Sequence, residues 1–111
     1  MSNNEIQSTI NNADSGSTIT FLGANYNNIS IKIDKTLNIV SNVRTTLHSS
    51  SNNSKNSIST VFYFKEGSFG SNISGLNIIA DKNGIVVNNS NSIKIYNNHI
   101  TSAYDSAIII V

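Results

Sequence analysis

The carboxylates of this chain are few and are scattered along the sequence, so few pairs of them could form a catalytic site. Such catalysis needs two carboxyl groups roughly 5 to 9.5 Å apart. The best candidates are Asp81 and Asp105, whose separation in the sequence could bring them together on successive turns of a repeat. Both lie among Asn, Gly, Tyr and Ser residues, a setting in which an Asp side chain commonly bonds its own backbone. The sequence therefore predicts turn residues at both positions and no catalytic residues.

The residues that bind metals or cofactors are equally sparse. His48 and His99 are the only histidines, and neither belongs to a motif with metal-ligand spacing. Arg44 is the only arginine, and no carboxylate accompanies it in the sequence. The chain has no cysteine, which excludes disulfides and thiolate metal sites. We expect no metal and no cofactor.

Two tyrosines are the candidate ligand-binding residues. Tyr63 stands between Phe62 and Phe64 in a strand pattern, so it lies on the face opposite to them. Tyr96 follows Lys94 on the face opposite Ile95. Both should point outward. An exposed Tyr can stack on a sugar ring and donate from its hydroxyl, although most single surface aromatic residues bind nothing.

Composition limits the class of protein. A chain of 111 residues forms one domain, and 18 Ile against 4 Leu favours strands over helices. Charged residues make up 12%, and Asn (20) and Ser (19) fill the polar positions instead. A net charge of +1 without a basic run argues against nucleic acid as a partner. No apolar run approaches the length of a membrane span, and the N-terminus does not resemble a signal peptide.

The elements that must position these residues repeat toward the end of the chain. Ile73, Leu76 and Ile78 correspond to Ile95, Asn98 and Ile100 at one constant offset. Strand-length segments at one period must stack to share a core. We therefore predict an all-β fold, a right-handed single-stranded parallel β-helix with coils of about 22 residues.

A short amphipathic helix should precede the coils. The segment 2–13 places Ile6 and Ile10 on one face, and Ser2 with Glu5 fits a capping box. We assign residues 1–16 to this capping helix, which would cover the open end of the solenoid, and residues 17–111 to the coils.

Alternating residues predict the faces of the strands. Residues 23–27 and 34–36 should be turns, residues 48–57 a polar surface loop, and segments 73–78, 84–87, 93–100 and 107–111 strands. In the segment 60–64, Thr60, Phe62 and Phe64 should face the core, and Val61 and Tyr63 the outside. The apolar strand at 107–111 lacks a polar cover, so we expect further coils of a longer chain beyond it.

Several of these segments resemble the pectate-lyase-like superfamily of parallel β-helix proteins, and in particular the N-terminal part of adhesin-like proteins of methanogenic archaea. The resemblance rests on a helix, a strand entry and a turn, which read Ile6-Gln7-Ser8-Thr9-Ile10-Asn11-Asn12-Ala13, Gly16-Ser17-Thr18-Ile19 and Leu22-Gly23-Ala24-Asn25-Tyr26. It implies the β-helix fold and a location at the cell surface or outside the cell.

Three functions remain open at this point. The first is a non-catalytic segment of an adhesin-like protein, acting as a structural stalk or as a surface that binds polysaccharide or the glycans of partner cells. The second is the N-terminal part of a carbohydrate-active lyase or hydrolase, whose acidic site would lie in later coils. The third is an orphaned fragment of a broken gene. Motifs of this kind are architectural and do not choose among them.

Overall fold

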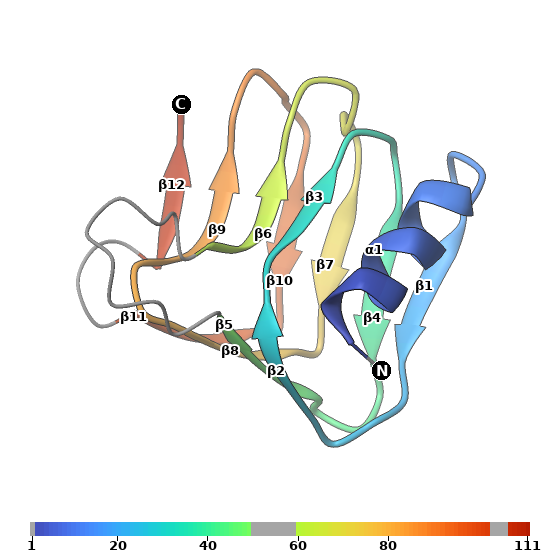
Figure 1. Ribbon diagram of the computed structural model, residues 1–111. Helices are drawn as coiled ribbons and strands as arrows, with labels where there is room; N and C mark the ends of the chain where they lie inside the picture. Colours follow the sequence, from blue (N-terminus) through green and yellow to red (C-terminus); the bar gives the residue numbers. More distant parts are fainter. Residues whose placement is uncertain (1, 50–59, 103–106) are drawn as a thin grey trace.

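The computed structural model describes residues 2–49, 60–102 and 107–111, which form a parallel β-solenoid with one short helix at its N-terminal end (Figure 1). The elements in chain order are α1 (Asn3–Asn12), β1 (Thr18–Phe21), β2 (Asn25–Ile29), β3 (Ile31–Ile33), β4 (Asn38–Ser41), β5 (Thr46–Ser49), β6 (Thr60–Phe64), β7 (Asn72–Ser74), β8 (Asn77–Ala80), β9 (Asn83–Val87), β10 (Lys94–Tyr96), β11 (His99–Ser102) and β12 (Ile108–Ile110).

These strands form three parallel sheets, and each sheet takes one strand from each successive coil. The strand orders are β1-β4-β7-β10, β2-β5-β8-β11 and β3-β6-β9-β12. Every connection therefore leads to the next sheet, and the chain returns to the first sheet one coil later. This confirms the predicted solenoid.

The predicted repeat is confirmed where it was seen, but the coils differ in length. Ile73 pairs with Ile95 and Ile78 pairs with Ile100, at the same offset in both cases. Earlier in the chain, Asn38 pairs with Thr18 in the coil before it and with Asn72 in the coil after it. The coil from Asn38 to Asn72 is therefore much longer than the coil from Thr18 to Asn38. Strand register is thus maintained while the connecting segments change length.

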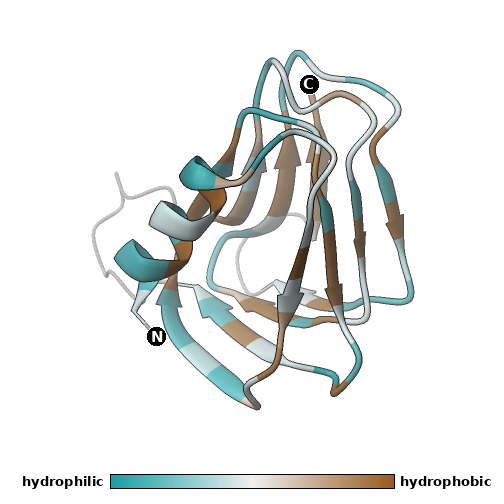
Figure 2. Ribbon diagram, turned by 90° about the vertical axis from the view of Figure 1, so that its right-hand side faces the viewer, coloured by the Kyte–Doolittle hydropathy of each residue, from teal (hydrophilic) through white to brown (hydrophobic). Residues whose placement is uncertain are grey.

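Columns of apolar side chains fill the space between the sheets. Ile31, Phe62 and Ile85 lie at paired positions of β3, β6 and β9, and all three are fully buried. Figure 2 shows the hydrophobic residues mainly on the strands and hydrophilic residues on the connecting turns. Because each core residue is paired with one directly above or below it, β-branched and aromatic side chains stack at the spacing between strands.

Helix α1 begins with the predicted capping box. The backbone N–H of Glu5 donates to Ser2 Oγ, and the Glu5 carboxylate accepts from the Ser2 backbone N–H. The Ser2 backbone N–H and the Ser2 hydroxyl both donate to the carboxylate, and these two hydrogen bonds lower the pKa of Glu5. Ile6 and Ile10 are buried against the first coil, as predicted.

Polar side chains of α1 also bond the exposed backbone of the first coil. The Gln7 carboxamide accepts from the Lys32 backbone N–H at 2.8 Å and donates to the Lys32 carbonyl at 2.9 Å. Asn3 accepts from the Ser30 backbone N–H at 2.9 Å. Gln7 thereby replaces the strand that would otherwise pair with the free edge of β3, which explains how a helix can close a sheet. Figure 1 shows α1 across the first coil and the C-terminus at the opposite end.

One corner of the solenoid repeats a left-handed backbone conformation in successive coils. Arg44, Gly75 and Asn97 each lie shortly before a strand of the β2-β5-β8-β11 sheet, with φ of 53°, 78° and 55°. A Cβ at Gly75 would overlap the Ser41 carbonyl oxygen, so no side chain fits there. The Arg44 guanidinium spans this corner and donates to the Asn97 carbonyl at 2.7 Å.

Some predicted boundaries are wrong because strands bend sharply at corners. The expected turn at 23–27 is largely β2, in which Tyr26 faces inward and packs edge-on against Phe21 with ring centroids 5.6 Å apart. The expected strands at 73–78 and 93–100 are each divided into two by the corner at Gly75 or Asn97. Residues 48 and 49 of the expected loop belong to β5, and its residues 50–57 lie outside the described part of the chain.

The predicted outward orientation of Val61 is also wrong. Val61 is fully buried in the core beside the position of Gly84 on the neighbouring coil. A Cβ at Gly84 would lie 2.5 Å from Ile100 Cγ2, so this part of the core is already filled by large side chains from the facing sheet. Strand alternation fails at Val61 because β6 begins at a corner, where consecutive residues can both face the interior.

Candidate functional site

A groove lies on the outer face of the sheet β3-β6-β9-β12. Its main hollow has a volume of about 720 Å³. Strands β3 and β6 and the turn after β6 contribute Lys32, Thr60, Tyr63, Lys65 and Glu66, and the connections after β2 and β9 contribute Ser30, Asn88 and Asn89. Residues from three successive coils therefore line one hollow.

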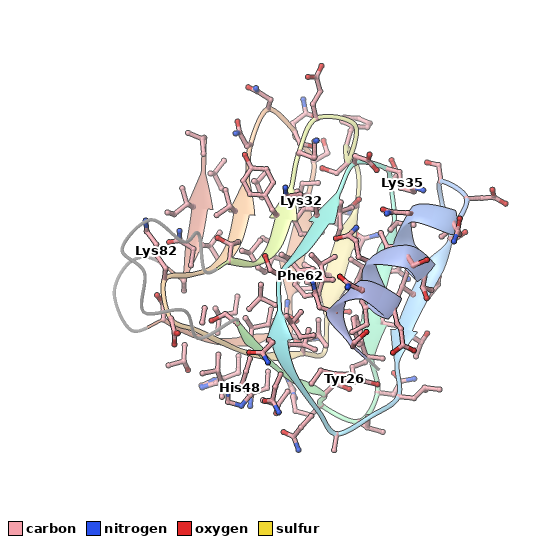
Figure 3. All side chains as sticks on the ribbon, in the orientation of Figure 1. Tyr26, Lys32, Lys35, His48, Phe62 and Lys82 are labelled. Atoms are coloured by element: carbon pink, nitrogen blue, oxygen red, sulfur yellow. The ribbon has the colours of Figure 1, made fainter. Side chains whose placement is uncertain are left out.

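Tyr63 occupies the groove because of strand alternation. Lys32, Tyr63 and Val86 are paired across β3, β6 and β9, and the residues on either side of Tyr63, Phe62 and Phe64, are fully buried. Figure 3 shows Phe62 among the side chains enclosed by the sheets and Lys32 on β3. The predicted outward orientation of Tyr63 is confirmed, and its side chain is half-buried.

The Tyr63 hydroxyl is held in place by one neighbour. Asn88 Nδ2 donates to it at 2.6 Å. A phenolic oxygen that accepts one hydrogen bond still has its own proton to donate. Tyr63 can therefore present a fixed donor and part of its ring to a molecule in the groove.

A second hollow of about 400 Å³ adjoins the first at its helix side. Ser30, Lys32 and Lys65 line both hollows, and Gln7, Asn11 and Asp34 line the second one only. Neither the Lys32 nor the Lys65 ammonium forms a hydrogen bond or an ion pair with another described residue. We call the two hollows together the β3–β6 groove; it runs from α1 across the first coils to Asn88.

Tyr96 lies elsewhere. It is 49% exposed on β10, in the sheet β1-β4-β7-β10, where its paired neighbour is Ser74. The predicted exposure of Tyr96 is confirmed. The two tyrosines do not form one site, because they belong to different sheets of the solenoid.

The other residues considered from the sequence do not gather into a site. Asp81 lies in the turn between β8 and β9, where its backbone N–H donates to Ser49 Oγ, and Asp105 lies outside the described residues. His48 and His99 occupy β5 and β11, with β8 between these strands in the sheet. Within residues 2–49, 60–102 and 107–111, no group of three His, Asp or Glu side chains could hold a metal ion.

Sequence reasoning missed the lysines and the amide beside Tyr63. The alternation of Ile31, Lys32 and Ile33 does place Lys32 outward. Lys32 pairs with Tyr63, however, across strands β3 and β6, and the chain between these strands includes the segment 50–59. The separation of Lys32 and Tyr63 in the sequence therefore does not follow the period of the repeat.

Comparisons with known proteins add no functional assignment. No helix in the described part of the chain is long and apolar enough to cross a membrane. No protein-family model, no curated protein and no solved structure matches the chain.

Proposed function

We propose that this chain is a non-catalytic β-solenoid module of a cell-surface or extracellular adhesin-like protein, and that its β3–β6 groove binds a carbohydrate. The observation that carries the proposal is Tyr63, whose half-buried ring and anchored hydroxyl line a hollow of about 720 Å³. The location at the cell surface is supported by the resemblance of the N-terminal motifs alone.

The chemistry of the groove suits a sugar. A sugar ring has weakly polar faces and a rim of hydroxyl groups, so its site needs an aromatic surface beside hydrogen-bond donors and acceptors. The groove combines the Tyr63 ring with the Asn88 and Asn89 amides and the Ser30 hydroxyl. These groups lie on paired strands and adjoining corners, which is the rigid support that a binding site requires.

The solenoid also suits a stalk. Strands in each sheet are paired with the coil before and the coil after, so each added coil extends the same core without a new packing arrangement. A module of this kind can hold a binding groove at a fixed height and orientation on an extended protein.

The test is a glycan array followed by calorimetric titration of the best ligand. Tyr63→Ala should weaken binding by about tenfold or more, because a buried aromatic contact and a hydrogen bond are both lost. Tyr63→Phe should retain part of the affinity, since it keeps the ring. Tyr96→Ala is the matched control on another sheet and should leave this binding unchanged.

Two results would contradict the proposal. If a monodisperse preparation shows no saturable binding to any glycan, only a structural role remains for these coils. If polysaccharide incubated with the protein gains new chain ends, the carbohydrate-active enzyme becomes the better assignment.

A further inference from the structure

We infer that the ligand of the β3–β6 groove is a saccharide with an anionic group, a carboxylate or a sulfate, which lies between Lys32 and Lys65. This inference rests on the proposed carbohydrate binding and specifies the ligand class. It concerns the junction of the two hollows, which both lysines line.

The backbone fixes the relative position of the two lysines. Lys32 is in β3 of the first coil, and Lys65 directly follows β6 of the second coil. The Lys65 backbone N–H donates to the Ile33 carbonyl at 2.9 Å, which continues the pairing of β3 with β6. Lys32 and Lys65 are therefore two register positions apart on adjacent coils, and both residues line both hollows.

These two ammonium groups are available to a ligand, whereas that of Lys35 is not. Lys35 Nζ donates to the carbonyls of Asn11 and Ala13 at 2.8 and 2.9 Å and so satisfies the end of α1. Lys32 and Lys65 are exposed and make no such contacts with described residues. Two like charges on neighbouring coils repel each other, and an anion between them would remove this repulsion.

Two acidic residues also line the groove, one in each hollow. Glu66 lines only the first hollow and Asp34 only the second, whereas Lys32 and Lys65 line both. Each hollow therefore has two lysines against one carboxylate, an excess of positive charge that favours an anion. The remaining groups of each hollow are mainly hydroxyls and amides, such as Tyr63 and Asn88 on one side and Asn11 on the other. They suit neutral sugar units on both sides of the charged one.

The experiment compares three oligosaccharides of equal length by calorimetric titration: a neutral gluco-oligosaccharide, a uronic-acid oligosaccharide and a sulfated one. We expect at least one anionic ligand to bind about tenfold more tightly than the neutral one. Comparing the affinities of the uronic-acid and the sulfated oligosaccharide then shows whether the groove prefers a carboxylate or a sulfate. Raising the salt from about 0.1 M to about 1 M should abolish most of this preference, because the screening length falls from about 10 Å to about 3 Å.

Charge removal tests the position of the anion. Lys32→Gln and Lys65→Gln should each weaken binding of the anionic ligand by about tenfold and binding of the neutral ligand by less than about twofold. Lys94→Gln, which removes an exposed lysine from β10 in another sheet, is the matched control and should change neither. Thermal unfolding of each variant verifies that the fold is retained.

The outcomes separate this inference from the proposed function. If the neutral ligand binds as tightly as the anionic ones and the lysine variants match the wild type, the inference is wrong and carbohydrate binding stands. If neither these oligosaccharides nor any glycan on the array binds, both are wrong. If duplex DNA binds as well as the anionic saccharide and depends equally on both lysines, the groove attracts any polyanion and the inference is also wrong.

Discussion

At the corner formed by Arg44, Gly75 and Asn97, two separate factors limit which residue type can be accommodated: the backbone φ angle and the space around the side chain. All three have positive φ, yet their residue types differ. Asn adopts this conformation readily and Arg at modest cost. Gly75 differs because the Ser41 carbonyl occupies the position that a side chain would need.

We predict that Gly75→Ala lowers the free energy of unfolding by about 2 to 3 kcal/mol, since strain from positive φ is added to steric overlap with backbone. Gly16→Ala is the control. Gly16 has φ of 91° and no atom within 4 Å of an added Cβ, so only the backbone cost of about 1 kcal/mol applies. Urea unfolding of both variants measures the difference, and equal losses would contradict the role assigned to Ser41.

The limits of sequence reasoning are visible at neighbouring residues. Alternation correctly placed Tyr63 outside, because its neighbours Phe62 and Phe64 are large and apolar. It failed at Val61, because β6 begins at a corner, where consecutive residues can both face the interior. The contact between Tyr63 and Asn88 depends on which coils are adjacent, so the order of residues along the chain does not reveal it.

At the scale of the element, α1 closes the first coil by two means. Its apolar face buries Ile6 and Ile10, and its polar residue Gln7 bonds both backbone groups of Lys32. The periodicity and the capping box predicted the helix and its buried face. The pairing of Gln7 with the strand edge was not predictable, because it requires the angle at which the helix crosses β3.

We expect Gln7→Ala to reduce stability by about 1 to 2 kcal/mol, the net contribution of two partly exposed hydrogen bonds, even though alanine favours the helix. Asn4→Ala, at an exposed position of the same helix, should be neutral or slightly stabilising. Thermal unfolding and amide hydrogen exchange at Lys32 report the effect. If the two variants unfold alike, Gln7 does not act as an edge partner.

At the scale of the whole molecule, the two ends of the solenoid differ. The first coil is covered by α1, whereas the apolar side chains of the last strand, β12, are largely exposed. Ile110 pairs with Val87 and continues the buried column that contains Ile33 and Phe64, yet it is 74% exposed. In the 111-residue chain such an edge is a site for association with another chain.

We therefore predict that the 111-residue chain self-associates as its concentration rises, and that Ile110→Lys shifts it toward the monomer. Val43→Lys, which removes a 58% exposed apolar residue away from β12, should have no such effect. Sedimentation velocity over a concentration series measures both. An equal response to the two substitutions would show that general hydrophobicity drives association, rather than the β12 edge.

The unequal coil lengths have a consequence for chain entropy. The loop that Asn38 closes with Asn72 is longer than the one it closes with Thr18, but it is less than twice as long. Closure entropy grows only with the logarithm of loop length, at about 0.6 kcal/mol for each doubling, so the longer coil is less than about 0.6 kcal/mol more costly to close. The corners of such a solenoid can accept inserted residues at little thermodynamic expense, provided that the strands keep their register.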